Sequence, residues 1–240
     1  MDVTTLIVAI AIAGAAGVVR GITGFGGSMV MSPPLALLVG PRLTVPVVLL
    51  LESLIAAPML WHTRRLVNWR LMGAILAAAC VTVPLGTLIL VRMDPPIMRR
   101  AIALTVVVFG VILLVGWRYA GRPRVATSMG LGALSGTMLG ATGVGGPPVV
   151  LYLLSGPDPV ATTRANLTLY VTVVSLFALA ALAYHGVLDR AAAVASLWLA
   201  PAYYIGLLIG TRVFPRLSDT RFRQFTLVLL IGVSIGILLA

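Results

Sequence analysis

Long apolar stretches alternate with short polar segments along the 240 residues of this chain. Crossing the hydrocarbon core of a bilayer as a helix takes about 20 apolar residues. Stretches of roughly that length occupy residues 43–61, 71–91, 101–117, 165–184, 191–210 and 225–240. Residues 3–39 and 125–155 are also apolar, but glycine and proline interrupt them, and each is long enough for two short or broken spans folded as a hairpin. The pattern predicts an all-α polytopic membrane protein.

The two halves of the chain repeat each other. The segment GITGFGG at residues 21–27 aligns with GATGVGG at 140–146, an offset of 119. The segment LGTLILVRMDPPIMRR at 85–100 aligns with IGTRVFPRLSDTRFRQ at 209–224, an offset of 124. Residues 1–120 and 121–240 are therefore predicted to be two repeats of about five segments each within one membrane domain, and each repeat opens with a broken helical hairpin. Internal repeats of this kind are typical of transporters, whose site lies where the halves meet.

Composition and charge set the predicted topology. The chain is 60% hydrophobic and 10% charged, whereas a soluble domain is about one quarter charged. All 17 basic residues are arginines, and they lie mostly between apolar runs, which indicates contact with lipid headgroups and excludes nucleic acid as the expected partner. If each hairpin crosses the membrane an even number of times, the repeats are inverted and the two sides carry 12 and 5 arginines, with Arg20 among the 12. If each hairpin crosses once, the repeats are parallel and the sides carry nine and seven. The positive-inside rule favours the inverted arrangement, with both termini outside the cytoplasm.

Several function classes receive little support from the sequence. One cysteine permits no intrachain disulfide, and no Cys/His spacing indicates a metal, so no cofactor is expected. No Walker motif is present, so a gradient is expected to drive transport unless a partner subunit supplies ATP. An intramembrane serine protease would need a histidine close to Ser28, but His62 and His185 are both predicted at membrane surfaces. We therefore expect a protein that is not an enzyme.

The two glycine-rich breaks are the predicted substrate site. Backbone is broken at membrane depth only where protein or a water-filled cavity satisfies it. A helix that starts after such a break directs free N–H groups and a positive dipole end at its surroundings, which suits an anion. The predicted substrate-binding residues of the breaks are Thr23, Gly24, Phe25, Gly26, Gly27, Thr142, Gly143, Gly145, Gly146 and Pro147. The alternative is that these glycines allow close packing between helices.

Polar side chains outside the breaks supply further candidates. Glu52 is the one carboxylate inside an apolar run, which indicates a coupling proton or ion ligand, or alternatively a structural partner for an arginine or a backbone N–H. Its rough counterpart in the second half is Ser175, so the pair is not symmetric. Arg20 is expected to end a helix at the cytoplasmic surface, with contact to an anion as the alternative.

Three residues beyond the second break complete the candidate set. Arg164 and Asn166 open the following helix, where they serve either as a surface charge and a cap or as the lining of an inward vestibule. Tyr152 either donates a hydrogen bond to a substrate oxygen or packs in the interior.

Four segments carry a resemblance to a known family. The segments GFGGSMVMSPPLALLVGPR, LVNWR, GATGVGGPPVVLYLL and RANLTLY resemble the TauE/SafE family of sulfite and organosulfonate exporters, and the resemblance covers nearly the whole chain. It implies a permease of the bacterial inner membrane that exports sulfite or related sulfur anions. We therefore expect a secondary transporter for a small oxyanion, working by alternating access, with both termini in the periplasm. An anion channel, an importer of another small anion and an assembly subunit are the alternatives, and the sequence leaves a homodimer open.

Overall fold

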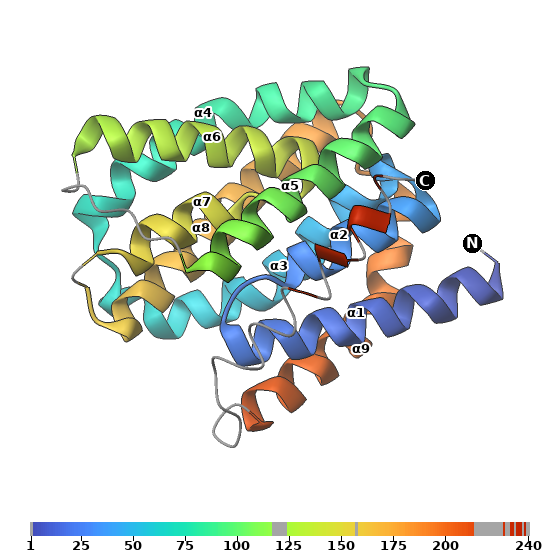
Figure 1. Cartoon of the computed structure of the whole chain (residues 1–240), viewed down its shortest axis with the longest axis horizontal. Helices are drawn as coiled ribbons and strands as arrows, with labels where there is room; N and C mark the ends of the chain where they lie inside the picture. Colours follow the sequence, from blue (N-terminus) through green and yellow to red (C-terminus); the bar gives the residue numbers. More distant parts are fainter. Residues whose placement is uncertain are drawn as a thin grey trace.

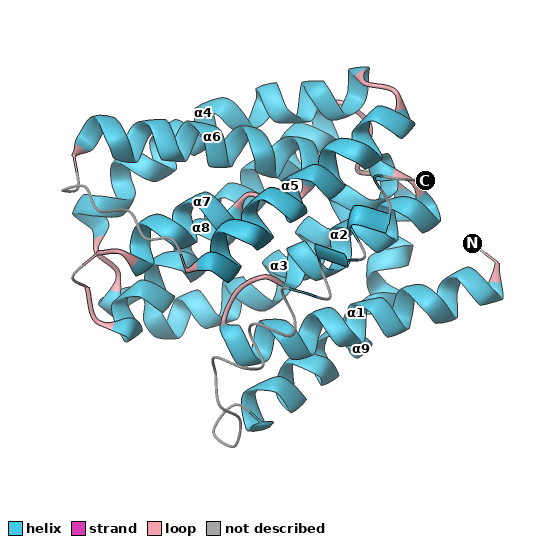
Figure 2. Cartoon of the chain, viewed as in Figure 1, coloured by secondary structure: helices cyan, strands magenta, loops and turns pink. Residues whose placement is uncertain are grey.

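The computed structural model describes residues 2–116, 124–156 and 158–213, together with a few positions between 228 and 238. Helices account for nearly all of these residues, and none of them lies in a strand (Figures 1 and 2). The helices of the described part are α1 (Val3–Thr23), α2 (Gly27–Val39), α3 (Pro41–Thr63), the 3-10 turn η1 (Arg64–Leu66), α4 (Trp69–Arg92), α5 (Pro95–Val115), α6 (Val125–Thr142), α7 (Gly146–Leu154), α8 (Val160–Tyr184) and α9 (Arg190–Val213).

Helices α1, α3, α4, α5, α8 and α9 are long and apolar enough to cross a membrane. The predicted spans at 43–61, 71–91 and 101–117 fall on α3, α4 and α5, and those at 165–184 and 191–210 fall on α8 and α9. The predicted all-α polytopic fold is thus confirmed. The last predicted span, 225–240, lies largely outside the described residues, as does Trp117.

Both glycine-rich regions are helical hairpins with matching breaks. Helices α1 and α6 each end in a left-handed glycine, Gly24 with φ 78° and Gly143 with φ 72°, which only a residue without a side chain adopts readily. The threonine before each glycine holds the turn. Thr23 Oγ1 accepts the N–H of Phe25 at 3.3 Å, and Thr142 Oγ1 accepts that of the residue two positions later at 3.2 Å. Similar residues at the repeat offset therefore build similar turns.

Two tight helix pairs, α1 with α9 and α4 with α6, use glycine to bring backbones together. A Cβ on Gly17 of α1 would overlap the carbonyl oxygen of Tyr203 on α9, and a Cβ on Gly136 of α6 would overlap that of Ala79 on α4. Gly17 and Gly136 are related by the repeat offset of 119, and Ala79 and Tyr203 are related by the offset of 124. The two contacts therefore correspond to each other in the repeat. Within each pair the contacts advance together along both helices, so α1 runs parallel to α9 and α4 runs parallel to α6. Small residues give this close approach in membrane helices.

Helices α3 and α8 form the centre of the protein. In each, 56% of the span is buried, against 33–39% in α1, α4, α5 and α9. The N–H of Asn68, just beyond α3, donates to Oδ1 of Asn166 near the start of α8 at 2.9 Å. At the opposite end of α3, Arg42 donates to the carbonyl oxygen of Val91 at the end of α4. Helices α3 and α8 therefore run antiparallel.

Candidate functional site

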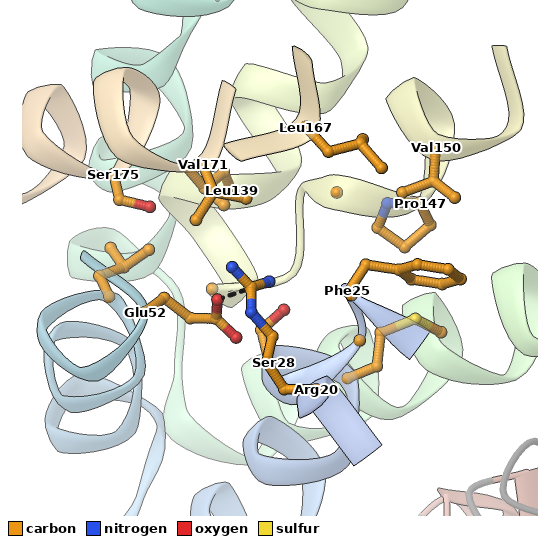
Figure 3. A pocket seen from close by; sticks show the side chains of 16 residues that line it. Arg20, Phe25, Ser28, Glu52, Leu139, Pro147, Val150, Leu167, Val171 and Ser175 are labelled. Atoms are coloured by element: carbon orange, nitrogen blue, oxygen red, sulfur yellow. Dashed lines mark ion pairs between the residues drawn. The ribbon is translucent and has the colours of Figure 1, made fainter. Parts of the chain in front are cut away.

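A pocket lies where the two broken hairpins approach each other (Figure 3). The space between its walls is about 490 Å³ including the part open to the exterior, and the volume that the centre of a water-sized molecule can occupy is about 30 Å³. Each half of the chain contributes eight residues to its lining: Arg20, Gly24, Phe25, Gly26, Ser28, Met29, Leu49 and Glu52 from the first, and Leu139, Gly143, Gly146, Pro147, Val150, Leu167, Val171 and Ser175 from the second. The position of this pocket between two repeats is the one expected for the substrate site of a transporter.

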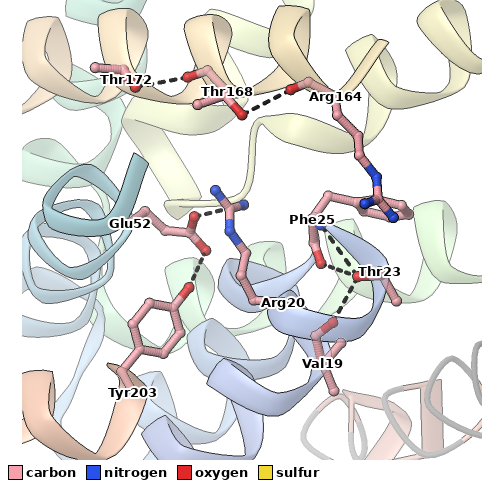
Figure 4. Close-up of polar contacts among 9 residues, drawn as sticks. All are labelled: Val19, Arg20, Thr23, Phe25, Glu52, Arg164, Thr168, Thr172 and Tyr203. Carbon is pink, nitrogen blue, oxygen red and sulfur yellow. Dashed lines mark hydrogen bonds and ion pairs between the residues drawn. The ribbon is translucent and has the colours of Figure 1, made fainter. Parts of the chain in front are cut away.

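A charged cluster occupies one wall of the pocket. Nη1 of Arg20 on α1 lies 2.8 Å from Oε2 of Glu52 on α3, and the hydroxyl of Tyr203 on α9 donates to Oε1 of Glu52 at 2.9 Å (Figure 4). The two charged side chains are only 7% and 4% exposed. Three helices from both halves of the chain therefore meet at one carboxylate.

Arg20 is not at the surface, contrary to the sequence-based expectation. Helix α1 continues past it to Thr23, so the bend falls at Gly24–Gly26 and the guanidinium stays inside. A buried charge persists only when it is paired, and Glu52 supplies the pairing charge. The alternative role foreseen for Glu52, a partner for an arginine, is thus present in this conformation. Removal of one member of such a buried pair costs about 3–5 kcal/mol, because the other charge is left uncompensated.

The positions related to this cluster by the repeat carry no charges. The repeat offset of 119 places Leu139 opposite Arg20, and the offset of 124 places Ala79 opposite Tyr203. The rough counterpart of Glu52, Ser175, is 1% exposed, and its hydroxyl lines the pocket with no hydrogen-bond partner in the part of the chain that the structure describes (Figure 3). A buried polar atom without a protein partner is uncommon, and this hydroxyl is able to bind a substrate oxygen.

The pocket brings together eight of the predicted site residues: Arg20, Gly24, Phe25, Gly26, Glu52, Gly143, Gly146 and Pro147. Thr23 and Thr142 lie behind the turns they stabilise. Gly27 faces the cluster from outside the lining, because a Cβ there would lie 2.7 Å from Oε1 of Glu52. Gly145 faces α6, where a Cβ would lie 2.5 Å from the carbonyl oxygen of Ser135.

The three candidates beyond the second break lie elsewhere. The hydroxyls of Tyr152 and Ser128 are 2.8 Å apart in the interior. Asn166 accepts the N–H that precedes α4, so it joins α8 to the α3–α4 connection. Arg164 extends beside Phe25 at the first break (Figure 4), and its Nε lies 3.6 Å from the place a Cβ on Gly24 would take. Of the three, Arg164 is thus the one nearest the pocket.

Sequence reasoning missed the helical walls of the pocket. The additional lining residues are Ser28, Met29, Leu49, Leu139, Val150, Leu167, Val171 and Ser175. Helical spacing contained part of this signal, because Leu167, Val171 and Ser175 follow one another at intervals of four and so share one face of α8. Tyr203 had no comparable signal, since it lies 151 residues from Glu52 in the chain.

The two helix N-termini at the breaks differ in the donors they offer. Neither α2 nor α7 has a side-chain cap. The first N–H groups of a helix have no partner within it, so α2 offers the N–H groups of Gly27, Ser28 and Met29. In α7, Pro147 and Pro148 follow Gly146 and have no N–H to donate. The first break therefore presents more donors than the second.

Comparison with known proteins adds two findings. The family described as "Sulfite exporter TauE/SafE" matches residues 9–237. Among curated proteins, the "Probable sulfite/organosulfonate exporter TauE" of Cupriavidus necator is 28% identical to this chain over 239 residues, which cover 95% of this chain and 92% of that protein. No solved structure matches the chain.

Proposed function

Because the chain belongs to the sulfite exporter TauE/SafE family, we propose that it is a secondary transporter that carries a small oxyanion out of the cell. Sulfite or a short organosulfonate is the proposed cargo, in keeping with the name of the Cupriavidus necator relative. The chain is a multi-pass membrane protein. The bacterial inner membrane is its proposed location.

The observation that carries this proposal is a buried arginine in a pocket between two broken hairpins. A guanidinium forms paired hydrogen bonds with oxyanions, and the N-terminus of a helix adds further donors. The N-terminus of α2 and the unpartnered hydroxyl of Ser175 lie at the same pocket as Arg20. The rest of the lining is largely apolar, with Phe25 and Val150 among it, and suits the alkyl part of a sulfonate.

Alternating access is the proposed mechanism, with the halves as inverted repeats. Three observations support the inversion: α3 and α8 run antiparallel, α1 runs parallel to α9, and α4 runs parallel to α6. The first helix of each repeat therefore packs beside the fourth helix of the other, as expected for two inverted halves that can rock against each other. With Arg20 inside the protein, the inverted arrangement places 11 arginines on one side and five on the other, which favours periplasmic termini.

Transport of ethanesulfonate by protein reconstituted in liposomes tests the proposal. We expect saturable uptake and counterflow, because a carrier must bind each anion before it moves. The double variant Arg20→Met with Glu52→Met removes both charges at once, so that neither is left buried without a partner, and we expect it to fold but lose uptake. Arg65→Gln, a change to an exposed arginine in η1, is the matched control and should retain uptake. Uptake that does not saturate and shows no counterflow would indicate a channel, and uptake by the double variant at the wild-type rate would remove Arg20 from the site.

A further inference from the structure

We infer that Glu52 is a proton-binding site and that one proton travels with each anion. The inference rests on the proposed function and specifies its coupling. It follows from the charge balance of the pocket, from the separate partners of the two Glu52 oxygens and from the asymmetry between the repeats.

Among the lining residues that the structure describes, the charges balance before any substrate enters, because Arg20 carries the one positive charge and Glu52 the one negative charge. Arg164 lies beside the lining residues Gly24 and Phe25 but does not itself line the pocket. The titratable groups that face Glu52 are Arg20 from α1 and Tyr203 from α9. The lining residues that α2, α6, α7 and α8 contribute are not titratable, and α4, α5 and η1 contribute none. An entering anion therefore meets a guanidinium that already has a carboxylate.

Neutralisation of Glu52 makes Arg20 available. Two negative groups on one buried arginine leave an uncompensated charge, which is expensive in a site of low dielectric. A proton from the aqueous side that adds to Oε2 of Glu52 ends its ion pair with Arg20. Oε1 still accepts the hydroxyl of Tyr203, so the neutral carboxyl keeps a partner. The guanidinium then pairs with the anion, and the hydroxyl of Ser175 donates to another anion oxygen.

The proton and the anion each strengthen the binding of the other, and this fixes the direction in which they move relative to each other. If the proton strengthens anion binding, the anion strengthens proton binding by the same factor. Both are then carried in the same direction. A singly charged anion with one proton moves no net charge across the membrane, so the membrane potential does not act on the transported pair. An outward anion gradient therefore drives export, and a more acidic exterior opposes it. A doubly charged anion would leave one negative charge in the pocket and is disfavoured.

The asymmetry of the repeats sets the number of protons at one. The positions that correspond to Arg20 and Tyr203 hold Leu139 and Ala79, and the hydroxyl of Ser175 stands in the place of the carboxylate. The positions related by the repeat therefore offer no equivalent proton site at this pocket.

Ethanesulfonate is a suitable probe because it stays singly charged over the working pH range, so every proton that moves is bound by the protein. In liposomes that contain a pH-sensitive dye, we expect one proton to enter with each ethanesulfonate. The affinity should fall about tenfold per pH unit on the alkaline side of its midpoint, as linkage to one proton requires. A potential set with potassium and valinomycin should leave the rate unchanged.

The variant Glu52→Gln distinguishes proton binding from anion binding, because it removes the proposed proton site. We expect the variant to bind ethanesulfonate with an affinity independent of pH, and any flux it supports should carry no proton and respond to the potential. Arg65→Gln, the change to an exposed arginine outside the pocket, is the control and should keep one proton per anion. Proton movement with ethanesulfonate in Glu52→Gln would overturn the inference.

Measurements on the wild-type protein alone test the inference without depending on the folding of any variant. Ethanesulfonate flux without protons would reject the inference and leave the transporter proposal intact. The absence of saturable ethanesulfonate flux in wild-type protein would reject both.

Discussion

Adjacent glycines at the second break give a sharp test of which residues face the substrate. Gly145 and Gly146 differ in what a side chain would meet. A Cβ on Gly145 would lie 2.5 Å from both the carbonyl oxygen of Ser135 and the Cβ of Leu139, whereas a Cβ on Gly146 has no atom of its surroundings within 4 Å. Gly146 lines the pocket and Gly145 does not. We therefore expect Gly145→Ala to damage the fold and Gly146→Ala to damage substrate binding.

The expected sizes follow from these surroundings. The clash at Gly145 involves the backbone of α6, which cannot move as a flexible side chain would, so overpacking should cost about 1–3 kcal/mol of stability. For a chain of this length, each kcal/mol lowers the unfolding midpoint by about 2–4 °C. At Gly146 the added methyl group meets no protein atom, and replacement of glycine in a helix changes stability by at most about 1 kcal/mol, in the favourable direction. The methyl group takes space from the anion instead, and a similar overpacking penalty weakens binding about tenfold or more.

Thermal unfolding of the purified protein in detergent, together with ethanesulfonate uptake by the same preparations in liposomes, measures both effects. The expected pattern is a lower midpoint for Gly145→Ala, and an unchanged or slightly higher midpoint with weaker uptake for Gly146→Ala. The reverse pattern, with Gly145→Ala stable but inactive and Gly146→Ala fully active, would show that the pocket wall at the second break has been assigned to the wrong glycine.

Three further predictions concern the scaffold. Gly86→Val should prevent stable folding, because a Cβ at Gly86 would overlap the α6 backbone. Gly73→Val on the same helix faces open space and should be tolerated, and gel filtration in detergent distinguishes the two variants. Thr23→Val removes the hydrogen bond to the N–H of Phe25 and should lower stability by about 1 kcal/mol, seen as a shift of the unfolding midpoint, and an unchanged midpoint would exclude a structural role for that bond. Cysteines placed at the exposed residues Arg65 and Asp94 should react with an impermeant thiol reagent from the cytoplasmic and the periplasmic side respectively, and reaction from the same side would reject the proposed topology.

The helices and their breaks were accessible from sequence because their causes are local. A run of about 20 apolar residues is sufficient to predict a span, and glycine and proline mark the places where a helix stops. The pairing of α1 with α9 and of α4 with α6 was not accessible in this way. Glycines at matching repeat positions, such as Gly86 and Gly210, show that something packs closely there, but not which helix does so.

The candidate site likewise contains a part that the sequence revealed and a part that it did not. Its backbone part, including Gly24 and Gly143, was found because the breaks are visible in the sequence. Its charged part was misjudged at Arg20, because an arginine next to a glycine-rich bend normally marks a membrane surface. Only the three-dimensional structure places Glu52 and Tyr203 beside it, from helices distant in the chain.

Each tight helix pair is joined to a central helix by polar side chains, and the two sets of polar contacts differ in their chemistry. On one side, Arg20 of α1 and Tyr203 of α9 both bind Glu52 of the central helix α3. On the other side, the hydroxyl of Ser135 on α6 lies 2.6 Å from that of Tyr170 on the central helix α8. The first link contains an ion pair, whereas the second consists of two uncharged hydroxyls. Close packing at the two pairs is similar, because Gly17, Gly21 and Gly210 at the first pair correspond to Gly136, Gly140 and Gly86 at the second. The two pairs therefore differ more in the chemistry of their link to the central helix than in their backbone packing.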